Sequence, residues 1–157
     1  MAAIAGHLHA DRDIPQDPRR IEAMLQRLVG PPGEPLQSWT SDGDCLACVG
    51  RDAGNLRAAG DRLKIVADAR LDDRKTLAGR LGCNEALPDV ALILAAHQRW
   101  GVDCASQLMG DFAFAIWDSQ NRSFYAARDL FGAKPLYYRR DRSGLAVASR
   151  LDALPQP

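Results

Sequence analysis

The apolar residues of this chain recur at helical spacing in its middle and in alternation near both ends. Segment 18–29 gives the clearest helical pattern, with apolar positions at i, i+3, i+4 and i+7. Asp17 precedes this segment as an N-cap, a proline opens it, and Gly30 follows its last residue. The pattern therefore predicts a helix that begins after Asp17 and ends before Gly30.

The remaining segments divide between strands and helices without a regular alternation of the two. Strands are expected at 3–9, 36–40, 45–51, 63–71, 111–118, 122–128, 135–140 and 145–149. Further helices are expected at 73–81, 89–100 and 102–109. A hairpin signal, S-D-G-D, joins the second and third strands. Strands at both ends with helices between them predict an α+β domain with mainly antiparallel sheets.

Length and composition fit one globular domain that spans residues 1–157, with 46% hydrophobic and 25% charged residues. The 20 basic residues balance the 20 acidic ones, which argues against a nucleic-acid-binding surface. No apolar run approaches the ~20 residues of a membrane-spanning helix. The N-terminus also lacks the pattern of a signal peptide. We therefore expect a cytoplasmic protein that binds neither nucleic acid nor membrane.

The cysteines and histidines do not predict a metal site. Cys45 and Cys48 form a C-x-x-C, but residues three apart on a strand face opposite sides of the sheet. His7 and His9 share a strand face, yet no third ligand is evident. We expect no metal or other cofactor, and free structural thiols throughout. These thiols belong to Cys45, Cys48, Cys83 and Cys104.

Two long motifs in the C-terminal third carry a family resemblance. Residues 110–118 read G-D-F-A-F-A-I-W-D, and residues 127–138 read A-R-D-L-F-G-A-K-P-L-Y-Y. Together they resemble the N-terminal domain of the asparagine synthetase family. The opening residues 4–6 and the segment 147–154 are similar to the same domain.

The resemblance implies a fold and an activity. The fold is of the N-terminal-nucleophile hydrolase type, a four-layer αββα sandwich of two mainly antiparallel sheets with helices outside. In active members this domain releases ammonia from glutamine and passes it to a C-terminal ATP-dependent synthetase domain. No S-G-G-x-D-S-type nucleotide loop occurs in the 157 residues, so we expect that second domain to be absent from this chain.

The same resemblance indicates where this chain departs from an active glutaminase. Active members begin M-C-G-I-x-G, whereas this chain begins M-A-A-I-A-G and has Ala2 at the position of the nucleophilic cysteine. Their N-G-E segment corresponds here to Asp68, Ala69 and Arg70. Asp68 would repel the oxyanion, where losing one donor costs ~10²–10³ in rate. Ala69 adds a Cβ where the backbone approaches the ligand, and Arg70 reverses the charge that holds the substrate's ammonium.

Other positions of the family's site are lost or have simpler roles. The loop whose arginine binds the substrate carboxylate corresponds to residues 29–32, V-G-P-P, so that arginine is missing. Asp89 is retained, but we expect it to be the N-cap or a first-turn acid of the following helix. Arg128, Asp129 and Lys134 flank a turn that we expect to be ion-paired and structural, or else an interface to a synthetase portion.

These departures predict a vestigial glutamine pocket in a non-catalytic domain. Asp68 should find a hydrogen-bond donor in Arg70 or in backbone N–H groups, because a buried unpaired charge is costly. Such loss resembles the N-terminal domains of lasso-peptide cyclases and β-lactam synthetases, which take the amine from their own substrate. The expected role is structural or docking.

The expected partner is an ATP-dependent synthetase domain or subunit, with a precursor peptide as a further candidate and a homodimer as a candidate assembly. Two alternatives remain open. One is the glutaminase domain of an asparagine synthetase with an altered nucleophile. The other is a stand-alone domain that binds a small molecule.

Overall fold

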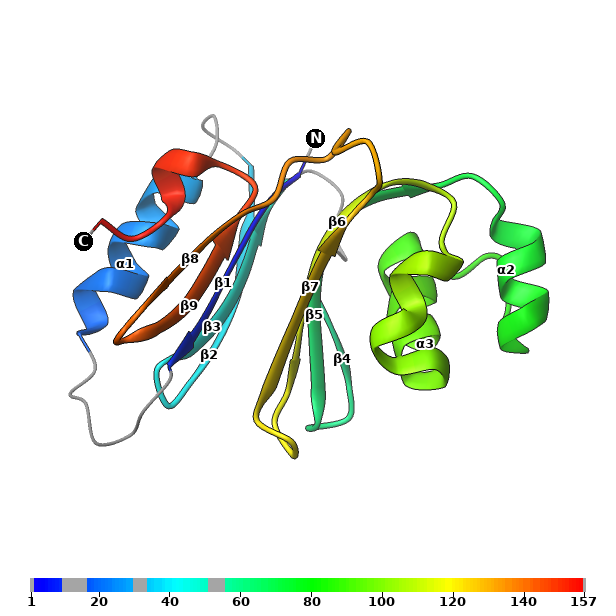
Figure 1. The fold of residues 1–157 in the computed structure, drawn as a ribbon, viewed down its shortest axis with the longest axis horizontal. Helices are drawn as coiled ribbons and strands as arrows, with labels where there is room; N and C mark the ends of the chain where they lie inside the picture. Colours follow the sequence, from blue (N-terminus) through cyan, green and yellow to red (C-terminus); the bar gives the residue numbers. More distant parts are fainter. Residues whose placement is uncertain (1, 10–16, 30–33, 51–55, 157) are drawn as a thin grey trace.

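Two β-sheets stacked face to face form the centre of the computed structural model, with helices on both outer sides (Figure 1). The structure describes residues 2–9, 17–29, 34–50 and 56–156. The strands are β1 (Ala3–His9), β2 (Leu36–Ser41), β3 (Asp44–Val49), β4 (Leu56–Ala59), β5 (Leu63–Leu71), β6 (Gly110–Asp118), β7 (Ser123–Arg128), β8 (Tyr137–Asp141) and β9 (Gly144–Ala148). The helices are α1 (Pro18–Leu28), α2 (Arg74–Leu81) and α3 (Asp89–Trp100), with 3-10 segments η1 (Gly101–Gln107) and η2 (Leu151–Ala153).

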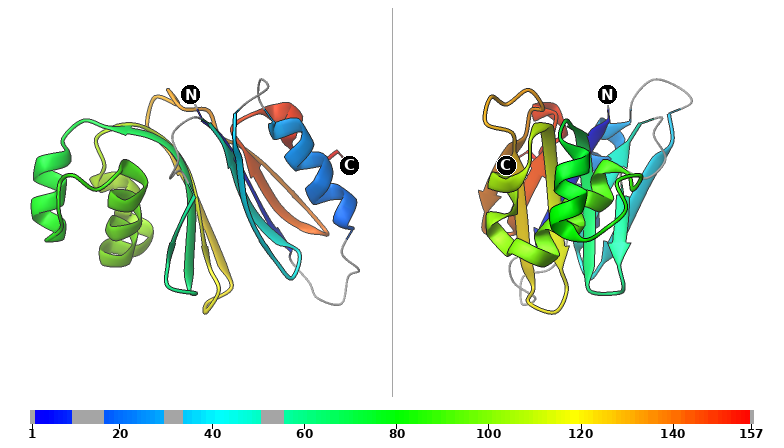
Figure 2. Two further views of the ribbon diagram at one scale, coloured as in Figure 1. Left: turned by 180° about the vertical axis from the view of Figure 1, so that it is seen from behind. Right: turned by 90° about the vertical axis from the view of Figure 1, so that its right-hand side faces the viewer.

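The strand pairings of the described residues are all antiparallel. One sheet has the order β2-β3-β1-β9-β8 and the other the order β4-β5-β6-β7. Helix α1 covers the outer face of the five-stranded sheet, and α2 and α3 lie outside the four-stranded one. Figure 2 shows the same four layers from behind. The predicted α+β sandwich is therefore confirmed. None of the helices in the described ranges is long and apolar enough to cross a membrane.

Three apolar clusters fill the spaces between these layers. One lies between α1 and the five-stranded sheet, a second between the four-stranded sheet and α3, and a third between the two sheets. Cys45 belongs to the α1 cluster and Cys48 to the inter-sheet cluster, so the two thiols do face opposite sides of β3. Burial raises the pKa of Cys45 to about 12 and that of Cys48 to about 11. All four cysteines are free thiols.

The Phe124 side chain of β7 packs closely against Gly6 of β1 in the other sheet. A Cβ added to Gly6 would lie 2.8 Å from Phe124 Cζ and 3.0 Å from Leu46 Cδ2. The glycine in the opening strand therefore leaves room for the Phe124 ring, which reaches across from the other sheet. This contact connects the N-terminal strand to the C-terminal third of the chain.

Most predicted elements are present within two residues of their expected ends. Asp17 caps α1 by accepting a hydrogen bond from the Arg19 N–H, as predicted. Segment 102–109, predicted as a helix, is instead the 3-10 segment η1. Strand β4 and segment η2 were not predicted, because each is too short to show a periodic pattern. Strand β8 begins after Pro135, which has no N–H to donate.

Candidate functional site

The residues that the family resemblance marked lie mainly at one end of the sandwich. The start of β1, the end of β5 and the turn between β7 and β8 meet there, at the top of Figure 1. Ala2 precedes β1 and is half-buried. Its methyl group offers no nucleophile. Ser149 lies near the start of β1 and forms two hydrogen bonds with the backbone of Ile4. Its Oγ accepts from the Ile4 N–H at 2.9 Å, and its own N–H donates to the Ile4 carbonyl.

Asp68 is buried on the inter-sheet face of β5 and forms an ion pair there. Its neighbour on that face, Val66, belongs to the inter-sheet cluster, as does Ala113, which lies opposite Asp68 in the sheet. The Lys134 Nζ donates to Asp68 Oδ1 at 3.0 Å, and the two side chains are only 17% and 11% exposed. The Asp68 carboxylate is therefore held in an ion pair between the two sheets.

Asp68 has a hydrogen-bond donor, as predicted, but the prediction that Arg70 would be that donor was wrong. Arg70 is two residues away on β5, but it lies at the strand's exposed end and binds other carboxylates. Its guanidinium pairs with Asp72 at 2.6 Å and with Asp111 at 3.1 Å. Lys134 instead approaches Asp68 from the β7–β8 turn. The sequence marked both partners, but nothing in their separation of 66 positions indicated that they would meet.

Ala69 and Asp89 contribute to the packing and hydrogen bonding between β5 and the helices outside it. The Ala69 side chain packs against the helix-side cluster, so its Cβ lies on the face opposite Asp68. Asp89 is a first-turn acid of α3 as predicted, but the N-cap position belongs to Pro88. The Asp89 carboxylate accepts from the Leu71 N–H at 3.1 Å and pairs with Arg74. It therefore ties the end of β5 to α3.

The β7–β8 turn is held together by the Asp129 carboxylate. This carboxylate accepts backbone hydrogen bonds from Phe112 at 3.3 Å, Ala133 at 2.9 Å and Lys134 at 3.0 Å. Burial alone would raise the pKa of Asp129, but these N–H groups outweigh it and keep the pKa below its ordinary value. These hydrogen bonds fix the backbone of the turn. Arg128, however, has no ion-pair partner among the described residues.

The same turn exposes two large apolar side chains. Leu130 and Phe131 are 91% and 92% exposed, although their neighbours Asp129 and Lys134 are buried or nearly so. The turn's internal hydrogen bonds therefore present an apolar pair to solvent on a fixed backbone. Sequence reasoning treated this turn as a unit and did not single out these two residues.

No group of three or more histidine, cysteine or acidic side chains that could hold a metal ion occurs in the part of the chain that the structure describes. His7 Nδ1 lies 3.1 Å from the Gly43 carbonyl, and burial lowers its pKa. The His9 N–H donates to the buried Asp44 carboxylate at 2.9 Å. Of the loop at 29–32, Val29 follows α1 and residues 30–32 lie outside the described residues, so the loss of the substrate-binding arginine stays a sequence prediction.

Comparisons with known proteins agree with this architecture. Residues 50–156 match the family described as a glutamine amidotransferase domain. The chain is 34% identical over 117 residues to a glutamine-hydrolysing asparagine synthetase of Bacillus subtilis (strain 168), a match that covers 69% of this chain and 19% of that protein. It is 42% identical over 67 residues to asparagine synthetase B of Escherichia coli (strain K12), covering 42% of this chain and 12% of that enzyme. The chain thus spans about a fifth or less of these relatives.

A solved structure extends the likeness to nearly the whole fold. The glutamine phosphoribosylpyrophosphate amidotransferase of B. subtilis, in complex with ADP and GMP, superposes with a TM-score of 0.66 at 14% identity. The match covers 98% of this chain and 42% of that one. At this identity the likeness concerns the fold alone, and it confirms the expected N-terminal-nucleophile hydrolase type of sandwich.

Proposed function

This chain belongs to the glutamine amidotransferase domain family, and from that premise we propose that it is a member that no longer hydrolyses glutamine and serves a structural or docking role instead. The partner in this proposal is an ATP-dependent amide-forming domain or subunit. That assignment is supported by relatives that are glutamine-hydrolysing asparagine synthetases several times longer than the matched segment. The proposal also treats the chain as one cytoplasmic domain, with the lasso-peptide cyclases as the functional analogy.

The buried Asp68–Lys134 pair is the observation that carries the proposal. Hydrolysis of an amide develops negative charge on its carbonyl oxygen, and enzymes stabilise that charge with fixed hydrogen-bond donors. A carboxylate at this position opposes the charge, and the nearest cation is already bound to the carboxylate at 3.0 Å. Together with the methyl group of Ala2, this arrangement lacks both the nucleophile and the electrophilic assistance that the reaction needs.

Glutamine turnover and binding test the catalytic half of the proposal. The purified chain should release no ammonia or glutamate from glutamine above background, and calorimetric titration should show no saturable heat at millimolar glutamine. Ala2→Cys restores a thiol but leaves Asp68 in place, so it should also remain inactive. Thiol-dependent turnover by the unaltered chain would overturn the proposal. Turnover by Ala2→Cys alone would show that the pocket is intact, and saturable binding without turnover would favour a small-molecule-binding domain.

The docking half of the proposal is supported by Leu130 and Phe131. Large apolar side chains held on a rigid turn are typical of the anchors that dominate protein interfaces. Replacing both with serine should weaken binding to the ATP-dependent synthetase portion encoded in the same or a neighbouring reading frame by at least about tenfold, which is 1.4 kcal/mol. Val102, 70% exposed in η1, provides the matched control as Val102→Ser. Equal loss in both variants would contradict docking at the turn.

A further inference from the structure

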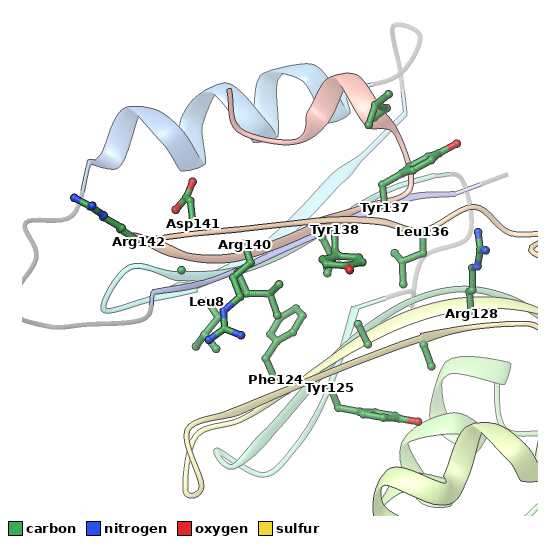
Figure 3. Close-up of a pocket in the computed structure, with 16 residues that line it drawn as sticks. Leu8, Phe124, Tyr125, Arg128, Leu136, Tyr137, Tyr138, Arg140, Asp141 and Arg142 are labelled. Carbon is green, nitrogen blue, oxygen red and sulfur yellow. The ribbon is translucent and has the colours of Figure 1, made fainter. Parts of the chain in front are cut away.

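A large groove opens between the two edge strands on one side of the sandwich (Figure 3). Its volume is about 1550 Å³, which exceeds the ~300–1,000 Å³ typical of small-molecule pockets. Apolar side chains of both sheets, several arginines and the ends of β8 and β9 form its walls. Ala2, Asp68 and Lys134 do not line it, so the groove is separate from the vestigial glutamine pocket.

The side chains of β8 alternate between this groove and the outside. Leu136, Tyr138 and Arg140 point into the groove, whereas Tyr137 and Asp141 point away from it. Phe124 rises from β7 toward Arg140 on the opposite wall. The groove therefore has an apolar middle and a guanidinium group at one end. Such a surface can bury apolar side chains and pair with a carboxylate.

Both strands that border the groove are sheet edges in the described part of the chain. Strand β8 pairs with β9 and strand β7 with β6, and each leaves its other side unpaired there. An unpaired strand edge offers a row of backbone N–H and C=O groups to an incoming extended segment. A strand added beside β8 would continue the five-stranded sheet, and alternate side chains of that strand would enter the groove.

The charges of the groove favour an acidic occupant. Arg128, Arg140 and Arg142 line it and have no ion-pair partner among the described residues. Asp141, the one acid among the lining residues, turns its carboxylate away from the groove, where Arg20 binds it at 2.6 Å and the Ser143 hydroxyl at 2.5 Å. A second copy of the chain is disfavoured, because pairing two β8 strands would bring two arginine-rich edges together.

We propose that this groove binds an extended peptide segment of a partner protein, which adds as a strand to the free edge of β8. The segment would carry apolar side chains at alternate positions and a carboxylate that pairs with Arg140. A carboxylate at its other end would lie toward Arg128. This proposal rests on the sheet edges and on the charge of the groove. It does not depend on the loss of glutamine hydrolysis, so the two can fail separately.

Fluorescence anisotropy with a defined peptide tests the proposal. The probe is a short fluorescein-labelled peptide in which leucine alternates with threonine and glutamate stands at both ends. It should bind saturably, and Arg140→Glu should weaken binding at least about tenfold because a charge-assisted pair becomes a repulsion. Arg99→Glu, the same charge change at an exposed position of α3, should change the affinity less than twofold. Circular dichroism melts establish that both variants remain folded.

Two altered probes separate strand addition from general charge attraction. A peptide with lysine in place of glutamate should not bind, and a peptide N-methylated on alternate backbone nitrogens should lose binding because it cannot complete the ladder with β8. Absence of saturable binding at millimolar concentration would overturn the proposal. So would equal binding by Arg140→Glu or by the N-methylated probe. A dimer in sedimentation that the peptide does not dissociate would assign the groove to a second copy instead.

Discussion

Removing the Lys134 side chain isolates the contribution of the buried ion pair to the stability of the fold. Lys134→Ala leaves the Asp68 carboxylate, 11% exposed, without its cation between the two sheets. Breaking a buried pair by removing one partner costs about 3–5 kcal/mol, and the residual exposure of both groups places the expected loss near the lower limit, about 3 kcal/mol. For a chain of this size that loss corresponds to a fall in melting temperature of roughly 6–12 °C.

A double-mutant cycle distinguishes the pair from a loss of packing alone. If the charges are coupled, Asp68→Ala in the Lys134→Ala background should restore part of the stability, with a coupling energy of about 2 kcal/mol. Urea unfolding followed by circular dichroism gives the free energies, provided that the m-value stays constant. Arg150→Ala serves as the control, because Arg150 pairs with Asp152 at the surface and should cost below about 1 kcal/mol. Additive effects of the two substitutions, or a loss below about 0.5 kcal/mol for Lys134→Ala, would refute the coupling that we describe.

Three further predictions concern the turn, the sheet contact and the thiols. The lowered pKa of Asp129 implies that its stabilising effect is complete above the ordinary carboxyl pKa and is lost as the pH falls through the folded-state pKa. Asp129→Asn should therefore flatten the dependence of the unfolding free energy on pH, measured by urea titration between about pH 5 and pH 2. Gly6→Ala should cost about 1–3 kcal/mol because its methyl group meets the Phe124 ring, and the additional substitution Phe124→Leu should recover part of that loss in thermal melts. A thiol reagent should label the partly exposed Cys83 first and the buried Cys45 only on unfolding, without prior reduction; simultaneous labelling would contradict the burial.

The layered fold could be predicted from the sequence because its elements carry strong local patterns. The ends of β1, β5 and α3 match the residues expected from alternation, helical spacing and the glycine after α3. Strand β4 was missed because its four residues contain a single large apolar side chain and depend on pairing with β5. The family motifs supplied the sandwich arrangement, which no local pattern encodes.

The candidate site was less predictable, because its key contacts join distant parts of the chain. Asp68, Arg70 and Lys134 were all marked, but spacing on β5 suggested that the first two would interact. Strand geometry fixes the face on which a side chain lies and not the partner that reaches it from another element. Arg70 pairs with two carboxylates at the exposed end of β5, and Lys134 pairs with Asp68 instead.

The β7–β8 turn connects the proposed loss of glutamine hydrolysis to the proposed docking role. Its polar groups are used internally, since Asp129 binds three backbone N–H groups and Lys134 binds Asp68. These bonds fix the backbone between them, so Leu130 and Phe131 lose little conformational entropy when a partner covers them. A turn whose only task was to close an inactive pocket would gain nothing from two apolar side chains that are more than nine-tenths exposed. In our proposal the ion pair that opposes glutamine hydrolysis also holds this apolar pair in place, which is why we assign docking to this turn.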